Sequence, residues 1–294
     1  MKRLAALALI ALAVAGPAAA TDQTLSEARA AHVTRIASKE RANEPLAKPP
    51  AGTFQQVTYR SPAGDLAAYV TPAPAGGGKH PAIIWLTGGD SNTIGDVWSP
   101  RDPRNDQSAS AYRKAGIVMM FPSLRGGNQN PGHREGMYGE VDDILAAYDY
   151  LAKLPYLDPG RIYLGGHSTG GTLVLLTAEV TGRFRAVFAF GPVAQAGDYG
   201  GRFLPAGLTD PAELRLRSPI FWLSSIRSPV FVLEGERGNA DSLNVLADAG
   251  RANPYLKTYL IPGADHFTVL APVNAIIAQK ILDDTGPTST ISFE

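Results

Sequence analysis

Short apolar runs alternate with longer amphipathic segments along most of this chain. From Pro81 onward the apolar runs are continuous rather than alternating with polar residues, which is typical of strands covered on both faces. The pattern therefore predicts strands at residues 82–86, 116–121, 162–164, 186–190, 230–233 and 257–261.

The segments between these runs have helical character. They predict helices at 108–114, 141–153, 169–180, 218–226 and 242–249, with a last helix at 275–283. Two earlier runs, 54–60 and 66–71, flank a turn-forming segment and predict a hairpin. Because parallel strands are joined through helices, this order predicts an α/β fold with a mainly parallel twisted sheet and helices on both faces.

The first twenty residues have the pattern of a secretory signal peptide. Lys2 and Arg3 precede an apolar run over 4–15, and the small residues 18–20 predict cleavage before Thr21. The apolar run is shorter than the ~20 residues that span a bilayer, so no stable membrane anchor is expected. We expect an exported protein, secreted or periplasmic.

Three regions follow from these patterns. After the signal peptide at 1–20, residues 21–52 predict a peripheral helix over 25–43 and a proline-containing linker. Residues 53–294 then form the α/β domain, which is long enough for one substantial core.

Charge and cysteine content narrow the partners. The 27 basic residues balance the 27 acidic ones, and the chain has no cysteine. This balance does not favour a nucleic-acid partner, and the fold has no disulfide to support it. Neither a G-x-G-x-x-G motif nor metal-ligand spacing is present, so no metal and no cofactor are expected.

The segment Gly166-His167-Ser168-Thr169-Gly170 is a G-x-S-x-G motif between a predicted strand and a predicted helix. A serine at such a sharp turn projects its hydroxyl above the sheet, and the glycines keep other side chains away. We therefore interpret Ser168 as a catalytic nucleophile.

A serine nucleophile needs a base, which is usually a histidine. Of the five histidines, only His266 lies in a loop after a predicted strand, at the sheet edge where α/β folds gather their chemistry. His266 is thus the predicted general base.

The acid that orients the histidine is expected in the loop after 230–233. We favour Asp241 because a short aspartate is the usual orienting group, with Glu236 and Glu234 as alternatives. Asp241 would equally serve as the N-cap of the helix that begins near Ser242.

An acyl-transfer site also needs donors to the developing oxyanion. The residue after the nucleophile and a loop after an early strand usually supply them. Here these are the backbone N–H groups of Thr169 and of Gly89 in the loop 87–90.

Taken together, the motifs resemble the catalytic domain of the prolyl oligopeptidase family within the α/β-hydrolase fold. The resemblance rests on the elbow at 162–171 and on the segments 141–143, 158–162, 121–127, 217–220 and 262–266, over about 82–283. It implies a serine peptidase or a close relative.

Two departures limit this resemblance. The family usually has its aspartate three residues after the glycine equivalent to Gly235, where this chain has Gly238. Larger members also carry a β-propeller, and the segment 21–79 is too short for one. The peptide specificity of the family therefore does not carry over.

The segment 191–217 lies where α/β-hydrolases insert caps, so it is expected to form a small cap over the site. Aromatic and aliphatic residues that could line an apolar cleft there are Tyr199, Phe203, Leu204, Trp222 and Trp98. We expect Arg125 to form an internal salt bridge rather than to meet a substrate.

The sequence thus predicts an exported serine hydrolase that cleaves a small peptide or an ester through an acyl-enzyme. A carboxylesterase that acts on small esters is one alternative. A catalytically silent binding protein with the same fold is another, since a fold does not fix its function.

Overall fold

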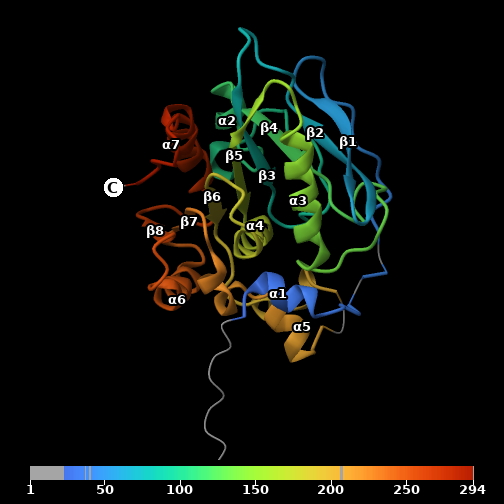
Figure 1. The fold of residues 1–294 in the computed structure, drawn as a ribbon, viewed down its shortest axis with the longest axis vertical. Helices are drawn as coiled ribbons and strands as arrows, with labels where there is room; N and C mark the ends of the chain where they lie inside the picture. Colours follow the sequence, from blue (N-terminus) through green and yellow to red (C-terminus); the bar gives the residue numbers. More distant parts are fainter. Residues whose placement is uncertain (1–22, 37, 40, 206–207, 294) are drawn as a thin grey trace, which may run out of the picture.

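The computed structural model describes residues 23–36, 38–39, 41–205 and 208–293, so the predicted signal peptide lies outside the described part. An eight-stranded sheet forms its centre, in the order β1-β2-β4-β3-β5-β6-β7-β8 (Figure 1). All neighbouring strands are parallel except the pairs β1–β2 and β2–β4. The strands are β1 (Gln55–Ser61), β2 (Gly64–Val70), β3 (His80–Leu86), β4 (Val118–Pro122), β5 (Leu157–His167), β6 (Val187–Phe190), β7 (Val230–Gly235) and β8 (Leu256–Ile261).

Both faces of this sheet are buried, and successive strand residues point to opposite sides. In β3, Ile84 packs in one core while Ile83 and Trp85 pack in the other. Helices α1 (Leu25–Ala30), α3 (Gly139–Leu151), α4 (Thr169–Val180) and α6 (Ala240–Gly250) contribute to the first core. Helices α2 (Ser110–Lys114) and α7 (Leu270–Asp283) contribute to the second. The predicted two-sided α/β architecture is confirmed.

The connections reverse direction at the centre of the sheet. The chain leaves β3 for β4 on one side and then crosses back through α3 to β5 on the other side of β3. Ligands of open α/β sheets bind at the carboxyl ends of strands near such a reversal. The topology therefore places the loops after β3 and β5 side by side.

Two predicted helices differ from the structure. The helix expected over 25–43 is only α1, because the chain after it extends to meet α5 (Pro211–Leu216), where Glu213 accepts hydrogen bonds from Thr34 Oγ1 (2.9 Å) and the Arg35 N–H (3.1 Å). The helix expected over 218–226 is two short 3₁₀ turns, Pro219–Phe221 and Leu223–Ser225. They are separated at Trp222, whose indole N–H donates to the Arg215 carbonyl (2.8 Å).

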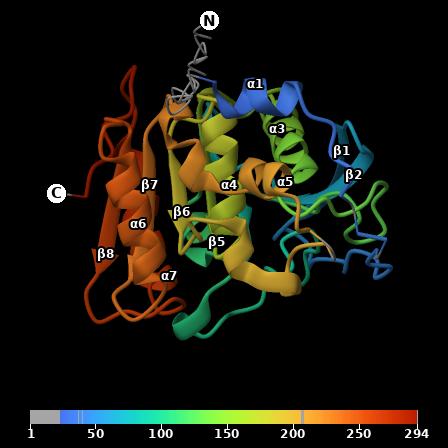
Figure 2. The ribbon, with the colours of Figure 1, turned by 90° about the horizontal axis from the view of Figure 1, so that it is seen from below.

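The segment between β6 and β7 forms the predicted cap. It contains a 3₁₀ segment (Ala196–Arg202) and then α5, which lies beside α1 (Figure 2). Buried Arg217 donates to the Glu213 carboxylate (2.5 Å) and to the Glu135 carbonyl. These bonds join the cap to the loop before α3.

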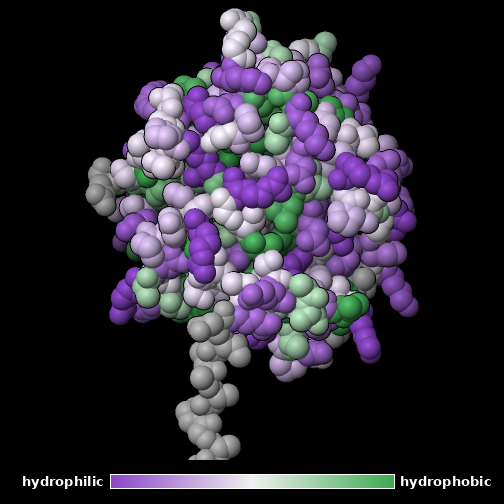
Figure 3. All heavy atoms as spheres, viewed as in Figure 1, coloured by the Kyte–Doolittle hydropathy of each residue, from purple (hydrophilic) through white to green (hydrophobic). Residues whose placement is uncertain are grey.

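The face in Figure 3 shows small hydrophobic groups scattered among hydrophilic residues. Among the helices of the described ranges, none has both the length and the apolar character needed to cross a membrane.

Candidate active site

Ser168 lies between the end of β5 and the start of α4. Its backbone has φ 56° and ψ −115°, a conformation that non-glycine residues rarely adopt. A Cβ at Gly166 would lie 2.6 Å from the Gly170 carbonyl oxygen, so the turn leaves no room for a side chain at this position. This strained elbow presents the Ser168 side chain at the carboxyl edge of the sheet.

His266 lies in the loop between β8 and α7, and its ring meets a carboxylate. Its Nδ1 lies 2.8 Å from Oε2 of Glu234, a fully buried residue near the end of β7. The Gly235 N–H donates to the other oxygen, Oε1 (2.6 Å). Glu234 therefore holds the imidazole with one oxygen and is itself held by the other.

The partner of His266 is thus Glu234 and not Asp241. Asp241 is exposed in the first turn of α6, and the N-cap of that helix is Asn239. Glu236 is also exposed and accepts from the Gly263 N–H (2.9 Å). The sequence predicts Asp241 as the acid and offers Glu234 only as an alternative.

Strand length and two glycines explain this correction. β7 continues past residue 233, so Glu234 still belongs to the buried edge of the sheet. A Cβ at Gly238 would overlap Oε1 of Glu234, and one at Gly191 would lie 2.5 Å from Cε1 of His266. These glycines leave the space that the longer glutamate and the imidazole occupy.

His167 connects the elbow to the histidine loop. Its Nε2 lies 2.8 Å from the His266 carbonyl oxygen, and the two imidazole centroids are 4.4 Å apart. Burial and, to a smaller extent, the nearby His266 lower the pKa of His167 to about 3. His167 is therefore neutral at ordinary pH. Because His167 directly precedes Ser168 and contacts the His266 carbonyl, Ser168 and His266 lie at the same edge of the sheet.

The Ser168 side chain faces the Tyr199 hydroxyl of the cap. That hydroxyl also lies 2.8 Å from Thr172 Oγ1, and burial raises the pKa of Tyr199. Within the described residues no hydrogen bond joins Ser168 directly to His266. The cap thus reaches the nucleophile itself. The sequence predicted only that Tyr199 would help to line a cleft.

The two predicted oxyanion residues are adjacent. The Thr169 N–H belongs to the first turn of α4, where backbone donors have no partner within the helix. The Thr169 hydroxyl donates to the Gly89 carbonyl (2.8 Å), and Gly89 has φ 78° in the loop after β3. This bond ties the loop of Gly89 to the start of α4.

A pocket of about 300 Å³ opens beside these two residues. Its lining includes an ion pair between Arg134 and Asp90 (2.7 Å) and apolar groups from α4 and the cap. The lining residues are Ser38, Gly89, Asp90, Ser91, Asn92, Arg134, Gly136, Met137, Thr169, Leu173, Gly201, Phe203, Leu204 and Pro205.

Phe203 and Leu204 therefore line the pocket, as predicted, but the two tryptophans do not. Trp222 is buried in the first core. Trp98 packs edge-on against Tyr69, at 5.4 Å between centroids. Both aromatic rings serve packing rather than the site.

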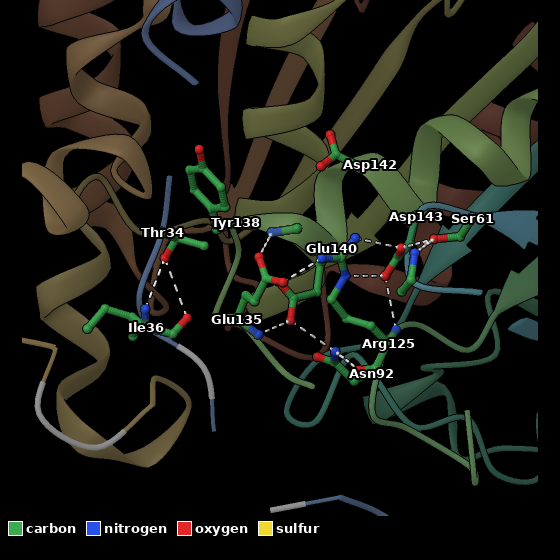
Figure 4. Close-up of polar contacts among 12 residues, drawn as sticks. Thr34, Ile36, Ser61, Asn92, Arg125, Glu135, Tyr138, Glu140, Asp142 and Asp143 are labelled. Carbon is green, nitrogen blue, oxygen red and sulfur yellow. Dashed lines mark hydrogen bonds and ion pairs between the residues drawn. The ribbon is translucent and has the colours of Figure 1, made fainter. Parts of the chain in front are cut away.

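Arg125 forms the internal ion pair that the sequence favoured (Figure 4). Its guanidinium donates twice to Asp143, each bond 2.9 Å long, and once to Glu135 (2.6 Å). Asp143 also accepts from Ser61 of β1. Arg125 thus connects the loop before α3 to α3 itself and, through Asp143, to β1 of the sheet.

Glu140 completes this cluster from the first turn of α3. It accepts from the Asn92 side chain (3.1 Å) and from the Glu135 N–H (2.8 Å), as Figure 4 shows. Burial raises its pKa. Because Asn92, Arg134, Gly136 and Met137 border the pocket, the cluster supports one of its walls.

For the described ranges, no group of three or more His, Cys, Asp or Glu side chains is arranged to hold a metal ion.

Comparison with known proteins places this chain near a family of known fold. Residues 103–235 match the model of the prolyl oligopeptidase family. Dipeptidyl-peptidase 5 of Porphyromonas gingivalis is 26% identical over 226 residues, which are 69% of this chain and 32% of that protein. The chain thus spans about a third of the length of this relative.

Solved structures share the fold. The 2,6-dihydroxy-pseudo-oxynicotine hydrolase superposes with a TM-score of 0.63 and 18% identity, over 79% of this chain and 68% of its own. The Pyrococcus furiosus esterase Pf2001 has the same TM-score and 14% identity, over 83% of this chain and 98% of its own. These solved structures show that the chain has the α/β-hydrolase fold, and the match over residues 103–235 makes it similar to the prolyl oligopeptidase family.

Proposed function

We propose that this protein is a serine hydrolase that cleaves its substrate through an acyl-enzyme on Ser168. The observation that carries the proposal is the hydrogen bond between His266 and buried Glu234, at the same sheet edge as the strained Ser168. A histidine oriented by a carboxylate is the base that a serine hydroxyl needs.

The proton path follows from this bond. Glu234 accepts the Nδ1–H of His266, so Nε2 carries the lone pair that takes the Ser168 proton. When a substrate enters, Ser168 exchanges its contact with Tyr199 for Nε2, since catalytic hydrogen bonds often form only in the complex. The serine oxygen then attacks the carbonyl, and His266 returns the proton to the leaving group.

Negative charge develops on the carbonyl oxygen during this attack. The Thr169 and Gly89 N–H groups are its proposed donors, and the Thr169 hydroxyl holds the Gly89 peptide in place. One of these donors is worth roughly a hundredfold to a thousandfold in kcat in other serine hydrolases.

The substrate we propose is a small ester or a short peptide. The pocket beside Thr169 has about 300 Å³, the lower limit for small-molecule sites, and we propose that it receives the acyl side of the substrate. A relative is named a dipeptidyl-peptidase and a structural neighbour an esterase, which supports both bond types. The carboxylesterase alternative is favoured by the small pocket and by the esterase whose chain is 98% covered.

Export is proposed from the signal-peptide pattern of residues 1–20. N-terminal sequencing of the protein from a periplasmic or culture fraction tests it. Thr21 at the N-terminus supports the proposal, and an intact Met1 contradicts it.

A fluorophosphonate probe tests the hydrolase proposal, because it reacts only with an activated serine. The parent protein should be labelled on the peptide that contains Ser168, and the Ser168→Ala and His266→Ala variants should not. Absence of labelling in the folded parent would instead support a silent binding protein. Parallel assays with p-nitrophenyl esters and aminoacyl-naphthylamides then separate esterase from peptidase activity.

A further inference from the structure

Gln107 connects two parts of the site that are far apart in sequence. It is half-buried in the loop that precedes α2, outside every motif that indicated chemistry. Its own carbonyl accepts from the Trp85 indole N–H of β3 (3.0 Å), so its backbone is fixed to the sheet. The two ends of its amide group bind to different loops of the site.

The amide oxygen holds the oxyanion loop. Gln107 Oε1 accepts from the Gly88 N–H (3.0 Å), one residue before the proposed donor Gly89. A Cβ at Gly88 would lie 2.9 Å from His167 Nδ1, so this loop is packed directly against His167. Gln107 therefore fixes the peptide that leads into Gly89.

The amide nitrogen holds His167. Gln107 Nε2 lies 2.8 Å from His167 Nδ1 and also donates to Asn105 Oδ1 (2.8 Å). Since an amide NH₂ only donates, Nδ1 of His167 is an acceptor and its proton is on Nε2. That Nε2–H then donates to the His266 carbonyl (2.8 Å).

We propose that Gln107 is a positioning residue which, through neutral His167, sets the distance between the oxyanion loop and the loop of His266. It touches neither the nucleophile nor the substrate, and it acts through Gly88 and His167. The chain of bonds runs from Gly88 to the backbone of His266 without a break. This inference rests on the proposed serine hydrolase function.

The expected effect is on the transition state rather than on substrate binding. A misplacement of about 1 Å in an oxyanion donor or a base can reduce the rate about a hundredfold. Loss of Gln107 should therefore lower kcat and leave KM for a small ester nearly unchanged. A boronic acid, which forms a tetrahedral adduct with an active serine, should bind more weakly by the same factor.

Two substitutions separate the two ends of the amide. Gln107→Met keeps the length of the side chain and removes both bonds. Gln107→Glu keeps an acceptor for the Gly88 N–H, but its ionised carboxylate has no proton to donate to His167. Gln279→Met is the matched control, because Gln279 is exposed on α7.

The assay measures kcat and KM for p-nitrophenyl acetate, the inhibition constant of phenylboronic acid, and Tm. We expect Gln107→Met to lose about tenfold to a hundredfold in kcat and in inhibitor affinity, Gln107→Glu to lose about tenfold, and Gln279→Met to match the parent. Parental kcat and inhibitor affinity in a folded Gln107 variant would overturn the inference. So would a loss of kcat with unchanged inhibitor affinity.

If Gln107→Met does not fold, Gln107→Glu decides the question alone, and parental kcat in that variant overturns the inference. The proposed hydrolase function is tested by a different result. If the parent hydrolyses no ester and Ser168→Ala behaves like the parent towards the probe, the hydrolase proposal is wrong, whatever the Gln107 variants do.

Discussion

Replacing Glu234 by Gln tests the assignment of the acid that orients His266. The side chain keeps its size, but its two ends become chemically different. The Gly235 N–H lies 2.6 Å from Oε1 of Glu234 and requires an acceptor there. The glutamine oxygen therefore takes that position, and its NH₂ group faces Nδ1 of His266, which is now 2.8 Å from a carboxylate oxygen.

This orientation reverses the tautomer of the imidazole. A donor facing Nδ1 forces Nδ1 to accept a hydrogen bond, so the ring proton moves to Nε2. Because Nε2 then carries a proton, it can no longer take the proton of Ser168. The equivalent change in other serine hydrolases reduces kcat about 10⁴-fold, which corresponds to about 5 kcal/mol of transition-state stabilisation. We expect a loss of this size for Glu234→Gln.

The matched control is Asp241→Asn, which removes a carboxylate of the first turn of α6. This exposed group interacts with the helix dipole at most, worth about 0.3–1 kcal/mol of stability, so kcat should stay within twofold of the parent. Steady-state hydrolysis of p-nitrophenyl acetate measures both variants, with circular dichroism to show that they are folded. If Asp241→Asn loses activity and Glu234→Gln keeps it, our reasoning is refuted.

Three further predictions concern stability and the pocket. Burial lowers the pKa of His167 to about 3, so between pH 6.5 and 3 the unfolded chain binds a proton that the folded protein does not, and stability is lost as pH falls. Urea unfolding at pH 7 and pH 5 should show about 2 kcal/mol more acid destabilisation in the parent than in His167→Gln; equal losses would contradict the pKa shift. Glu179 of α4 is buried, with no hydrogen-bond partner among the described residues, and burial raises its pKa well above the usual range. Its folded form thus retains a proton that the unfolded chain releases above about pH 4.5, so stability falls as pH rises, and Glu179→Met should raise Tm by several degrees at pH 8 but much less at pH 4. An equal change in Tm at both pH values would rule out this account. Leu204→Trp narrows the pocket, so the ratio of kcat/KM for p-nitrophenyl butyrate to that for the acetate should fall several-fold; an unchanged ratio would place the acyl chain elsewhere.

Most of the fold could be predicted because its strands are continuous apolar runs. Each predicted strand is present, although β5 begins earlier than expected, at Leu157. Ser168 lies at the expected elbow and His266 in the expected loop, since both positions depend on local order along the chain. The short α1 was not predictable, because the segment after it is held by Glu213, nearly 180 residues away.

The acid of the site needed three-dimensional information. Glu234 and Asp241 both follow β7, and the choice depends on which side chain has room beside His266. Gly191 and Gly238 make that room from two different loops. The signal in the sequence was the position of Glu234, directly after the apolar run and before Gly235.

Gln107 illustrates a second limit of sequence patterns. Its amide has no motif around it, and its partners Gly88 and His167 are 19 and 60 residues away. Only the packing of the loops after β3 and β5 brings them together. Residues that position a site through hydrogen bonds to backbone therefore escape analysis of one sequence.

The central claim is that Ser168 becomes acylated with His266 as its base. Rapid acid quenching of the parent protein with p-nitrophenyl acetate, followed by mass spectrometry of its peptides, tests this directly. We predict an added acetyl group, about 42 Da, on the peptide that contains Ser168, and none in His266→Ala. Substrate turnover with no acyl group on Ser168, or with the acyl group on another residue, would contradict the account.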